Sequence, residues 1–401
     1  MTQPEEQQRA ASNSSPAESS GVFISGVDHL PAHFGSGWIS GILSIALGMI
    51  GLGTVLCLHF PWLLTMPELR GNYPLPVIRG LLFAVLIASF VLGSISVYLR
   101  ERKILGLAGL FLTLAAMLLG GASAPIGNAD PNSPYVGLDW FILNLIFYSL
   151  LFLPLERLFP LRPDQPVFRS QWQTDLSYFF VSSLLVQTTT YLTLKPAAWF
   201  FAWAQLAPLQ GAVRSQPFWL QLIEVLLVTD LTQYWIHRAF HRIPLLWRFH
   251  KIHHSVQVMD WLAGSRLHLV DVVVTHGLSY IPVYWLGFSD PAVYAYIALV
   301  SLQATFIHAN VRFEFGLVKW MVATPAFHHW HHSAEREAVD KNFSVHLPLW
   351  DWLFGTFYLP QRWPAAYGLA DGGSIPPGYL RQLVAPFRAA ADRDTRDSSR
   401  E

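Results

Sequence analysis

Histidine is the residue type that points to chemistry in this chain, because 13 of its 16 histidines lie between His237 and His346. Eight of them are regularly spaced: one pair is four positions apart, and two sets of three follow the pattern HxxHH. Such spacings place the imidazoles of each set on one face of a helix. The eight are His237, His241, His250, His253, His254, His328, His331 and His332. We interpret them as ligands of metal ions.

The number of imidazoles indicates two metal ions. Ordinary transition-metal coordination uses no more than roughly six ligands, so eight histidines are too many for one ion. His268 and His308 are further candidates in the same region. Imidazole ligation favours zinc, copper, iron or nickel over magnesium or calcium. Because Cys57 is the only cysteine, neither a cysteine-based metal site nor an internal disulfide is possible.

Three other histidines of this region are expected to lie outside the metal ligands. His329 and His346 are neighbours of the spaced motifs, and His329 occupies a variable position of HxxHH. His276 stands alone inside an apolar run, where we expect a packed core histidine. Isolated histidines of this kind are more often structural than catalytic.

The spacing leaves other functions open. A zinc-dependent membrane hydrolase would need the general-base glutamate of an HExxH motif, and Arg238 occupies that position. A non-catalytic metal transporter or haem carrier would place ionisable groups in the middle of its membrane spans, whereas these clusters follow the spans. Histidines can also anchor helices at a membrane boundary, but three spaced clusters argue against a purely structural role.

The composition is that of a polytopic membrane protein. Hydrophobic residues make up 52% of the 401 residues and charged residues only 13%, whereas soluble chains carry roughly 25% charged residues. The 26 basic and 26 acidic residues balance, which argues against nucleic-acid binding. Eight apolar runs are long enough to be membrane spans. They lie at about 38–63, 75–98, 104–121, 139–155, 175–195, 217–236, 269–288 and 291–311.

The basic residues predict how these spans are oriented. Residues 100–103 (Arg-Glu-Arg-Lys) follow the second span and Arg157, Arg162 and Arg169 follow the fourth, whereas 122–138 contain no lysine or arginine. The positive-inside rule therefore places the basic segments in the cytoplasm. The last two spans form a hairpin, so both histidine regions return to that side. We expect a cytoplasmic metal site in a plain inner or plasma membrane.

Four segments follow from this organisation. Residues 1–36, rich in Ser, Gln, Glu and Gly, are expected to be a disordered tail, and 37–160 a four-span region of unknown role. Residues 161–360 are expected to be the histidine-rich catalytic domain, with about four membrane helices. Residues 361–401 form a C-terminal tail in which 379–388 are expected to be a short interfacial helix. The predicted fold class is all-α: a polytopic transmembrane helical protein with a cytosolic, histidine-rich di-metal site at the membrane face.

The order HxxxH, HxxHH and a distant HxxHH resembles the fatty acid hydroxylase/sterol desaturase superfamily of integral-membrane di-iron enzymes, over about 220–360. The string Leu347-Pro-Leu-Trp-Asp351-Trp-Leu-Phe-Gly355-Thr is similar to the superfamily signature LPLWDxLFGT. Three shorter segments also resemble its motifs: Arg266-Leu-His268-Leu-Val-Asp271, Phe306-Ile-His308-Ala-Asn310 and Asp340-Lys-Asn342. The chain departs from the pattern at Phe327 and His329, where the third motif often has His and Arg, and at Asp271, which replaces Glu.

The resemblance implies two iron ions that activate O₂ to hydroxylate or desaturate a lipid drawn from the bilayer. It supports His268 and His308 as the ninth and tenth ligands, and it implies that Asp271, Asn310, Asp340 and Asn342 support the ligands. Asp271 is expected to hold His268 or a neighbouring ligand. Because no dinucleotide, haem or flavin motif is evident, we expect electrons from a separate ferredoxin or cytochrome-type reductant.

Overall fold

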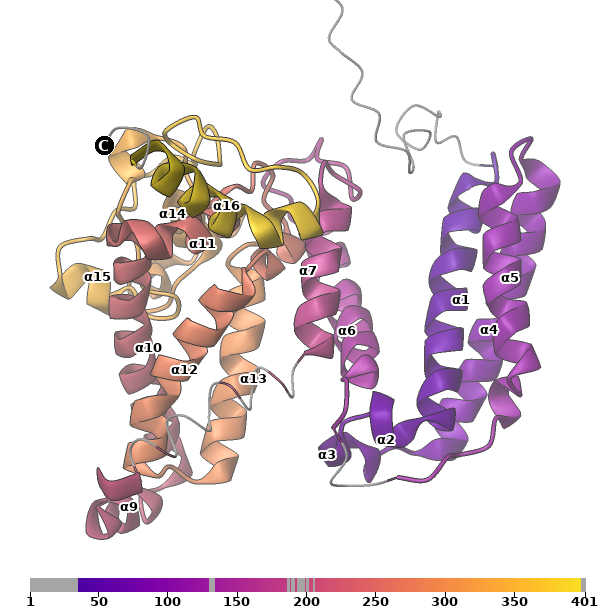
Figure 1. Cartoon of the computed structure of the whole chain (residues 1–401), viewed down its shortest axis with the longest axis horizontal. Coiled ribbons are helices and arrows are strands. Elements are labelled where there is room, and N and C mark those ends of the chain that lie inside the picture. Colours follow the sequence, from indigo (N-terminus) through magenta and orange to yellow (C-terminus); the bar gives the residue numbers. More distant parts are fainter. Residues whose placement is uncertain are drawn as a thin grey trace, which may run out of the picture. The chain divides into compact units, whose positions relative to one another are not determined.

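The structure is a computed structural model, and it describes residues 35–129, 134–185 and 206–397 together with isolated residues between 186 and 205. Within these ranges the chain forms helices and two isolated β-bridges, Pro160 with Val311 and Ser333 with Tyr367. The predicted all-α class is confirmed (Figure 1). Almost all of the tail expected at 1–36, and the last residues of the C-terminal tail, lie outside the described residues.

The chain divides into two compact units, the first of which comprises Met1–Leu52 and Arg79–Ala122. Its helices are α1 (Trp38–His59), α4 (Leu75–Leu99) and α5 (Ile104–Leu118), and the first two extend into the second unit. Small residues let these apolar helices approach closely. A Cβ on Gly109 would lie 2.0 Å from Ser44 Oγ, and that hydroxyl donates to the Ser89 carbonyl at 2.7 Å. Small-residue packing and hydroxyl hydrogen bonds therefore hold the unit together.

The second unit comprises Gly53–Ile78 and Ser123–Glu401 and contains all of the clustered histidines. Its longer helices are α6 (Leu138–Leu158), α7 (Trp172–Leu184), α9 (Ala207–Arg214), α10 (Phe218–Arg242), α11 (Pro244–His254), α12 (Leu269–Leu286), α13 (Asp290–Phe306), α14 (Pro325–His331) and α16 (Tyr379–Asp397). Its shorter helices are α2 (Pro61–Leu64), α3 (Pro67–Arg70), η2 (Ala202–Ala204), η3 (Trp261–Ser265), η4 (Gly316–Trp320), η5 (Arg336–Ala338) and α15 (Leu349–Leu353), and η1 (Gly121–Ser123) spans the boundary between the two units. The fourth of the expected N-terminal spans, α6, thus belongs to the same unit as the histidines.

Helix α10 of the second unit packs along both α12 and α13 (Figure 1). Val225 of α10, Val283 of α12 and Tyr296 of α13 share one buried apolar cluster. α12 is capped by Gly287, whose φ of 69° lies in the left-handed region that glycine adopts without strain, and α13 begins at Asp290. This hairpin returns the chain to the end of the unit where α11 and α14 lie.

Five helices in the described part of the chain are long and apolar enough to cross a membrane, as a multi-pass integral membrane protein requires. They are Trp38–His59, Leu75–Leu99, Ile104–Ser123, Leu138–Leu158 and Leu269–Leu286. The expected span at 217–236 lies in α10, which contains Glu224 and Asp230, and that at 291–311 corresponds to α13, which has 17 residues. The run at 175–195 begins in α7 and continues outside the described residues.

Candidate metal centre

Helices that begin with proline carry two of the three histidine clusters. Pro244 starts α11 directly after α10, and Pro325 starts α14, because the fixed φ of proline suits the first turn of a helix. Thr324 caps α14 by accepting the N–H of Phe327 at 3.3 Å. The remaining cluster occupies the end of α10. Three separate helix segments thus present histidines to one region of the second unit.

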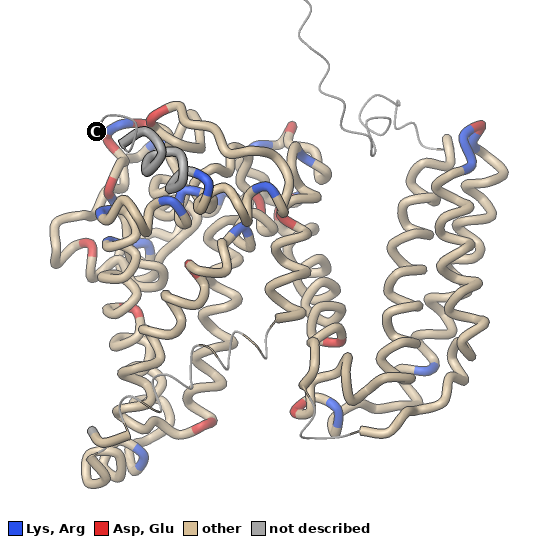
Figure 2. The backbone as a smooth tube through the Cα atoms, in the orientation of Figure 1, with Lys and Arg blue, Asp and Glu red and all other residues tan. Residues whose placement is uncertain are grey.

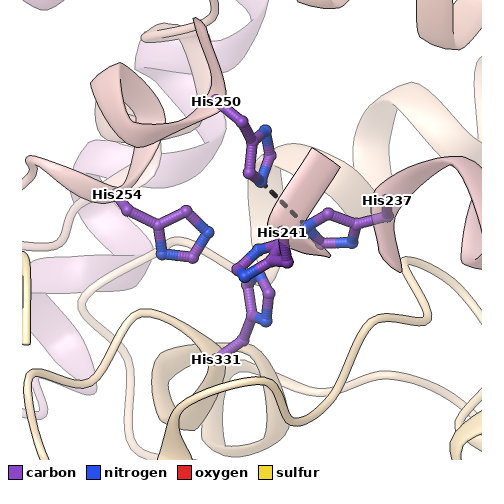
Figure 3. A group of neighbouring side chains, drawn as sticks. All are labelled: His237, His241, His250, His254 and His331. Atoms are coloured by element: carbon purple, nitrogen blue, oxygen red, sulfur yellow. Dashed lines mark hydrogen bonds between the residues drawn. The ribbon is translucent and has the colours of Figure 1, made fainter. Parts of the chain in front are cut away.

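Five histidines from these segments converge (Figure 3). They are His237 and His241 from α10, His250 and His254 from α11, and His331 from α14, and we call them the five-histidine group. Their ligand nitrogens all lie within 4.8 Å of one another. The Nε2 atoms of His237 and His250 are 3.0 Å apart. A single ion placed among these nitrogens would be within reach of all five rings.

Four further histidines form a second convergent set, the four-histidine group. They are His253, His308, His328 and His332. The Nε2 atom of His328 lies 3.0 Å from that of His308 and 3.1 Å from that of His332, and the Nε2 atoms of His308 and His253 are 3.4 Å apart. The structure therefore brings together nine of the ten histidines predicted as ligands. Each HxxHH motif contributes to both groups.

Backbone carbonyl groups fix the protons of several imidazoles. His237 Nδ1 lies 2.7 Å from the Phe343 carbonyl oxygen, and His331 Nδ1 lies 2.8 Å from that of Lys341. A carbonyl oxygen can only accept, so these Nδ1 atoms carry the proton and the Nε2 atoms present lone pairs. Lone pairs that face one another without a donor are unfavourable unless a cation lies between them. The donor set of the five-histidine group therefore fits a transition-metal ion, and the four-histidine group offers the same type of ligand.

The environment keeps these imidazoles neutral. His254, His331 and His332 are buried, as is His253. Burial, together with the neighbouring imidazoles, lowers the pKa of these four side chains well below the ordinary value. Only the neutral ring can bind a metal ion through Nε2 while Nδ1 keeps its proton. The histidines are thus held in the form that ligation requires.

Asp271 holds His250, whereas His268 lies outside both groups. The Asp271 carboxylate accepts the proton of His250 Nδ1 at 2.6 Å. Asp271 was expected to hold either His268 or a neighbouring ligand, and its partner in the structure is the neighbouring ligand His250. His268 Nδ1 accepts the N–H of Val270 at 3.1 Å, and His268 Nε2 donates to the Leu383 carbonyl at 3.0 Å. Both ring nitrogens of His268 are engaged, so it caps α12 and contacts α16.

The segment 340–343 lies against three members of the five-histidine group, His237, His241 and His331. Asp340 lies 3.6 Å from His241 Nδ1, and the backbones of the next residues supply the carbonyl partners described above. Asn342 is fully buried with a φ of 59°, and its side-chain amide donates to the carbonyls of Phe327 at 2.9 Å and Tyr358 at 2.7 Å. Both predicted supporting residues therefore contact the elements that carry the histidines.

The other histidines of the region face different partners. His329 Nδ1 lies 2.8 Å from the Tyr367 hydroxyl, and His346 Nδ1 lies 3.1 Å from the Gln303 side-chain oxygen. Neither belongs to a convergent group. The expectation for His276 is wrong, because its side chain is exposed on α12 and is not packed in the core.

The match to known families agrees with this geometry. Residues 222–356 match the fatty acid hydroxylase family model, and this range contains all nine grouped histidines. The chain carries a fatty acid hydroxylase domain. The resemblance drawn from the histidine spacing and the LFGT string is confirmed.

Relatives of the fatty acid hydroxylase domain include membrane lipid hydroxylases and monooxygenases. An ornithine lipid hydroxylase of Rhizobium tropici is 33% identical over 171 residues, covering 43% of this chain and 51% of the relative. The human alkylglycerol monooxygenase is 31% identical over 141 residues, 35% of this chain and 31% of the relative. A methylsterol monooxygenase of Aspergillus fumigatus is 25% identical over 207 residues, 49% of this chain and 66% of the relative. The chain thus spans about half the length of the first relative and about a third of the second. No solved structure matches the chain.

Sequence reasoning missed one carboxylate of the fatty acid hydroxylase domain, although it stands in the LPLWDxLFGT string. Asp351 is fully buried and accepts the N–H groups of Phe343 at 2.8 Å and Ser344 at 2.7 Å. The Thr356 hydroxyl donates to it at 2.6 Å. Asp351 therefore fixes the backbone whose carbonyl faces His237. The aspartate of the signature acts through this backbone, and none of its hydrogen bonds in the described part of the chain goes to a histidine ring.

A buried ionic network behind the four-histidine group was also missed. The Arg266 carbonyl lies 3.2 Å from His253 Nδ1, and the Arg266 guanidinium pairs with Asp175 of α7. Arg169 bridges Asp175 and Asp260, at 2.6 Å to each. Charged residues are rare in this chain, so these four are noticeable in the sequence. Their pairing could not be predicted, because it joins segments that are distant along the chain. Asn310, which was expected beside the ligands, exchanges hydrogen bonds with the backbone of Arg162 instead.

Proposed function

We propose that the chain is a membrane-bound di-iron oxygenase that uses O₂ and externally supplied electrons to hydroxylate a lipid. One observation carries the proposal: two adjacent groups of buried imidazoles converge, and in the five-histidine group the Nε2 lone pairs of His237 and His250 face each other, because both Nδ1 protons are held elsewhere. The relatives support a lipid substrate, since they are hydroxylases or monooxygenases of an ornithine lipid, alkylglycerols and methylsterols.

The five-histidine group would hold one iron and the four-histidine group the other. Bound iron would supply the redox chemistry that breaking an unactivated C–H bond with O₂ requires, which Zn²⁺ does not offer. The chain itself orients the rings: the carboxylate of Asp271 and the carbonyls of Lys341 and Phe343 hold their Nδ1 protons. His268 is not part of our proposed ligand set, because both of its ring nitrogens are engaged elsewhere.

The electron source and the membrane side complete the proposal. Lys and Arg are concentrated at the end of the second unit that carries α11 and α14, whereas the middle parts of α10, α12 and α13 carry few charged residues (Figure 2). The positive-inside rule favours the cytoplasm for that end, in an inner or plasma membrane. We infer that a ferredoxin or cytochrome-type protein delivers electrons there.

A zinc hydrolase is less well supported by the same region. Arg238 stands where a protease motif has its general base, and it donates to the Tyr234 hydroxyl at 3.2 Å while lying over the Trp235 ring. The carboxylate of Asp271 is engaged with His250. Neither residue is placed to activate water.

The test combines metal analysis with product analysis. The full chain is purified anaerobically, its metals are counted, and lipid extracts of expressing and deletion strains are compared after growth under ¹⁸O₂. We expect close to two irons per chain and a lipid that gains one ¹⁸O atom, with His331→Ala as the inactive control. Loss of two hydrogens without oxygen would make the chain a desaturase. Two zinc ions with O₂-independent turnover would overturn the proposal.

A further inference from the structure

A large apolar surface lies outside the metal centre, on η4 with the two residues that follow it and on α15. Leu317 is 82% exposed and Met321 68% exposed, and on α15 Trp352 and Leu353 are 63% and 65% exposed. Together with their neighbours they form one patch, which we call the lip and define as residues 317–322, 349, 352 and 353. Large exposed apolar patches mark binding surfaces for proteins or membranes.

The lip is built on the metal-binding part of the domain. Trp320 and Trp352 join its two halves, with ring centroids 6.1 Å apart. Trp320 stacks on Phe357 at 5.2 Å, and Phe357 packs on Phe327 at 5.7 Å. Phe327 is fully buried and directly precedes His328. The exposed surface therefore rests on α14, and its position is coupled to that of the four-histidine group.

Basic side chains lie beside tryptophan rings both on the lip and on the neighbouring part of α10. Phe354, at the end of α15, packs on Trp235 of α10 at 4.9 Å. The Arg238 guanidinium lies 5.4 Å from the centre of the Trp235 ring, and the Lys319 ammonium lies 5.6 Å from that of Trp320. Tryptophan beside lysine or arginine is the pairing favoured at the level of lipid headgroups.

The lip also lies at the level where a candidate membrane helix ends. Ile236 and Phe240 of α10 pack with Val270 and Val274, which belong to the first turns of α12. Trp235 precedes Ile236, so this part of α10 stands beside the α12 terminus nearest the metal centre. Figure 1 shows α15 next to that end of α10.

We propose that the lip enters the headgroup and outer acyl region of the bilayer and thereby fixes α14 at the membrane surface. Its four most exposed apolar side chains would lie among acyl chains, while Lys319 and Arg238 would meet lipid phosphates. The two cation–aromatic pairs favour lipid over a second copy of the chain as the occupant. The proposed membrane contact does not depend on the reaction, so it is expected for any lipid that the metal centre oxidises.

The single cysteine of the chain makes the lip accessible to site-directed spin labelling. In a Cys57→Ser background, Met321→Cys and Leu353→Cys would each carry a nitroxide in the full chain, reconstituted in nanodiscs of phosphatidylethanolamine and phosphatidylglycerol. Glu337→Cys, an exposed site on η5, is the matched control. If Cys57→Ser does not fold, the same labels in the wild-type background serve, because Cys57 is buried.

We expect oxygen to relax the labels at 321 and 353 several-fold more effectively than a water-soluble nickel chelate does, with the opposite order at 337. Equal access of the nickel chelate to all three sites would overturn the proposal. Protection at 321 and 353 that comes with spin–spin broadening, and that disappears on dilution with unlabelled protein, would also overturn it, because a second copy would then be the occupant.

Discussion

The rings of His254 and His332 stack with centroids 4.6 Å apart and an interplanar angle of 23°, although His254 belongs to the five-histidine group and His332 to the four-histidine group. The two groups are therefore in direct contact through this pair of imidazole rings. This arises because each HxxHH motif ends in two adjacent histidines whose side chains point to different groups. Among the described residues, the ring contacts of His241 are confined to its own group and to the aromatic residues Trp247 and Phe343.

Removing His254 should therefore disturb both metals, whereas removing His241 should disturb one. We expect His241→Ala to retain close to one iron per chain. His254→Ala should in addition weaken the remaining site roughly 10- to 100-fold, as loss of a supporting contact does. Iron content after dialysis against graded chelator concentrations measures this difference. Identical titrations for the two variants would show that the stacked pair does not couple the groups.

The carboxylate of Asp271 provides a second test, because it touches the metal centre only through the proton of His250 Nδ1. Asp271→Asn keeps the shape of the side chain but removes its charge. We expect metal affinity to fall roughly 10- to 100-fold, with partial recovery in Asp271→Glu. Asp290→Asn, an exposed carboxylate at the start of α13, is the control and should bind metal normally. Unchanged affinity in Asp271→Asn would mean that the ring of His250 is positioned by packing alone.

Adjacent histidines on α14 give a third comparison. His328 Nε2 faces His308, whereas His329 Nδ1 faces the Tyr367 hydroxyl. His329→Gln should keep its full metal content and lose about 1–3 kcal/mol of unfolding free energy, the usual cost of disturbing a buried hydrogen bond. His328→Gln should lose the metal of the four-histidine group. Metal counts and thermal unfolding of the two variants distinguish these roles, and iron loss in His329→Gln would contradict them.

The ligand spacing was predictable from the sequence, but the division of the ligands was not. Residue type and period place His250, His253 and His254 on one helix face, yet the face is wide enough to serve two centres. The partners of the Nδ1 atoms could not be foreseen either, because they are backbone carbonyls such as that of Phe343, which leave no signal in residue type. Asp351 acts through that same backbone, so its place in the LPLWD string did not reveal its contacts.

For the membrane helices too, the sequence predicted the local feature but not the long-range grouping. Length and apolarity predicted the four N-terminal spans and the span in α12, all of which the described helices match. The sequence alone could not show that α6 belongs with the histidine-bearing unit. That grouping depends on long-range contacts, such as those of Glu156, which accepts the N–H groups of Trp261 and Asn310 at 2.8 and 2.9 Å. Such pairings are set by tertiary structure and have no local pattern.

The last test concerns His268, which joins α12 to the C-terminal helix. Its Nε2 donates to the Leu383 carbonyl, and its ring lies 5.9 Å from that of Phe387. We expect His268→Ala to keep its metals but to release α16, so that trypsin cleaves after the exposed Arg381 or Arg388 roughly two- to ten-fold faster, as loss of one hydrogen bond implies.

His308→Ala is the matched control, because His308 lies in the four-histidine group and makes no contact with α16 in the described structure. It should lose iron without faster cleavage of α16. The two variants thus separate metal binding from helix docking. Iron loss in His268→Ala with unchanged cleavage would return His268 to the ligands, as the family motif around it first implied.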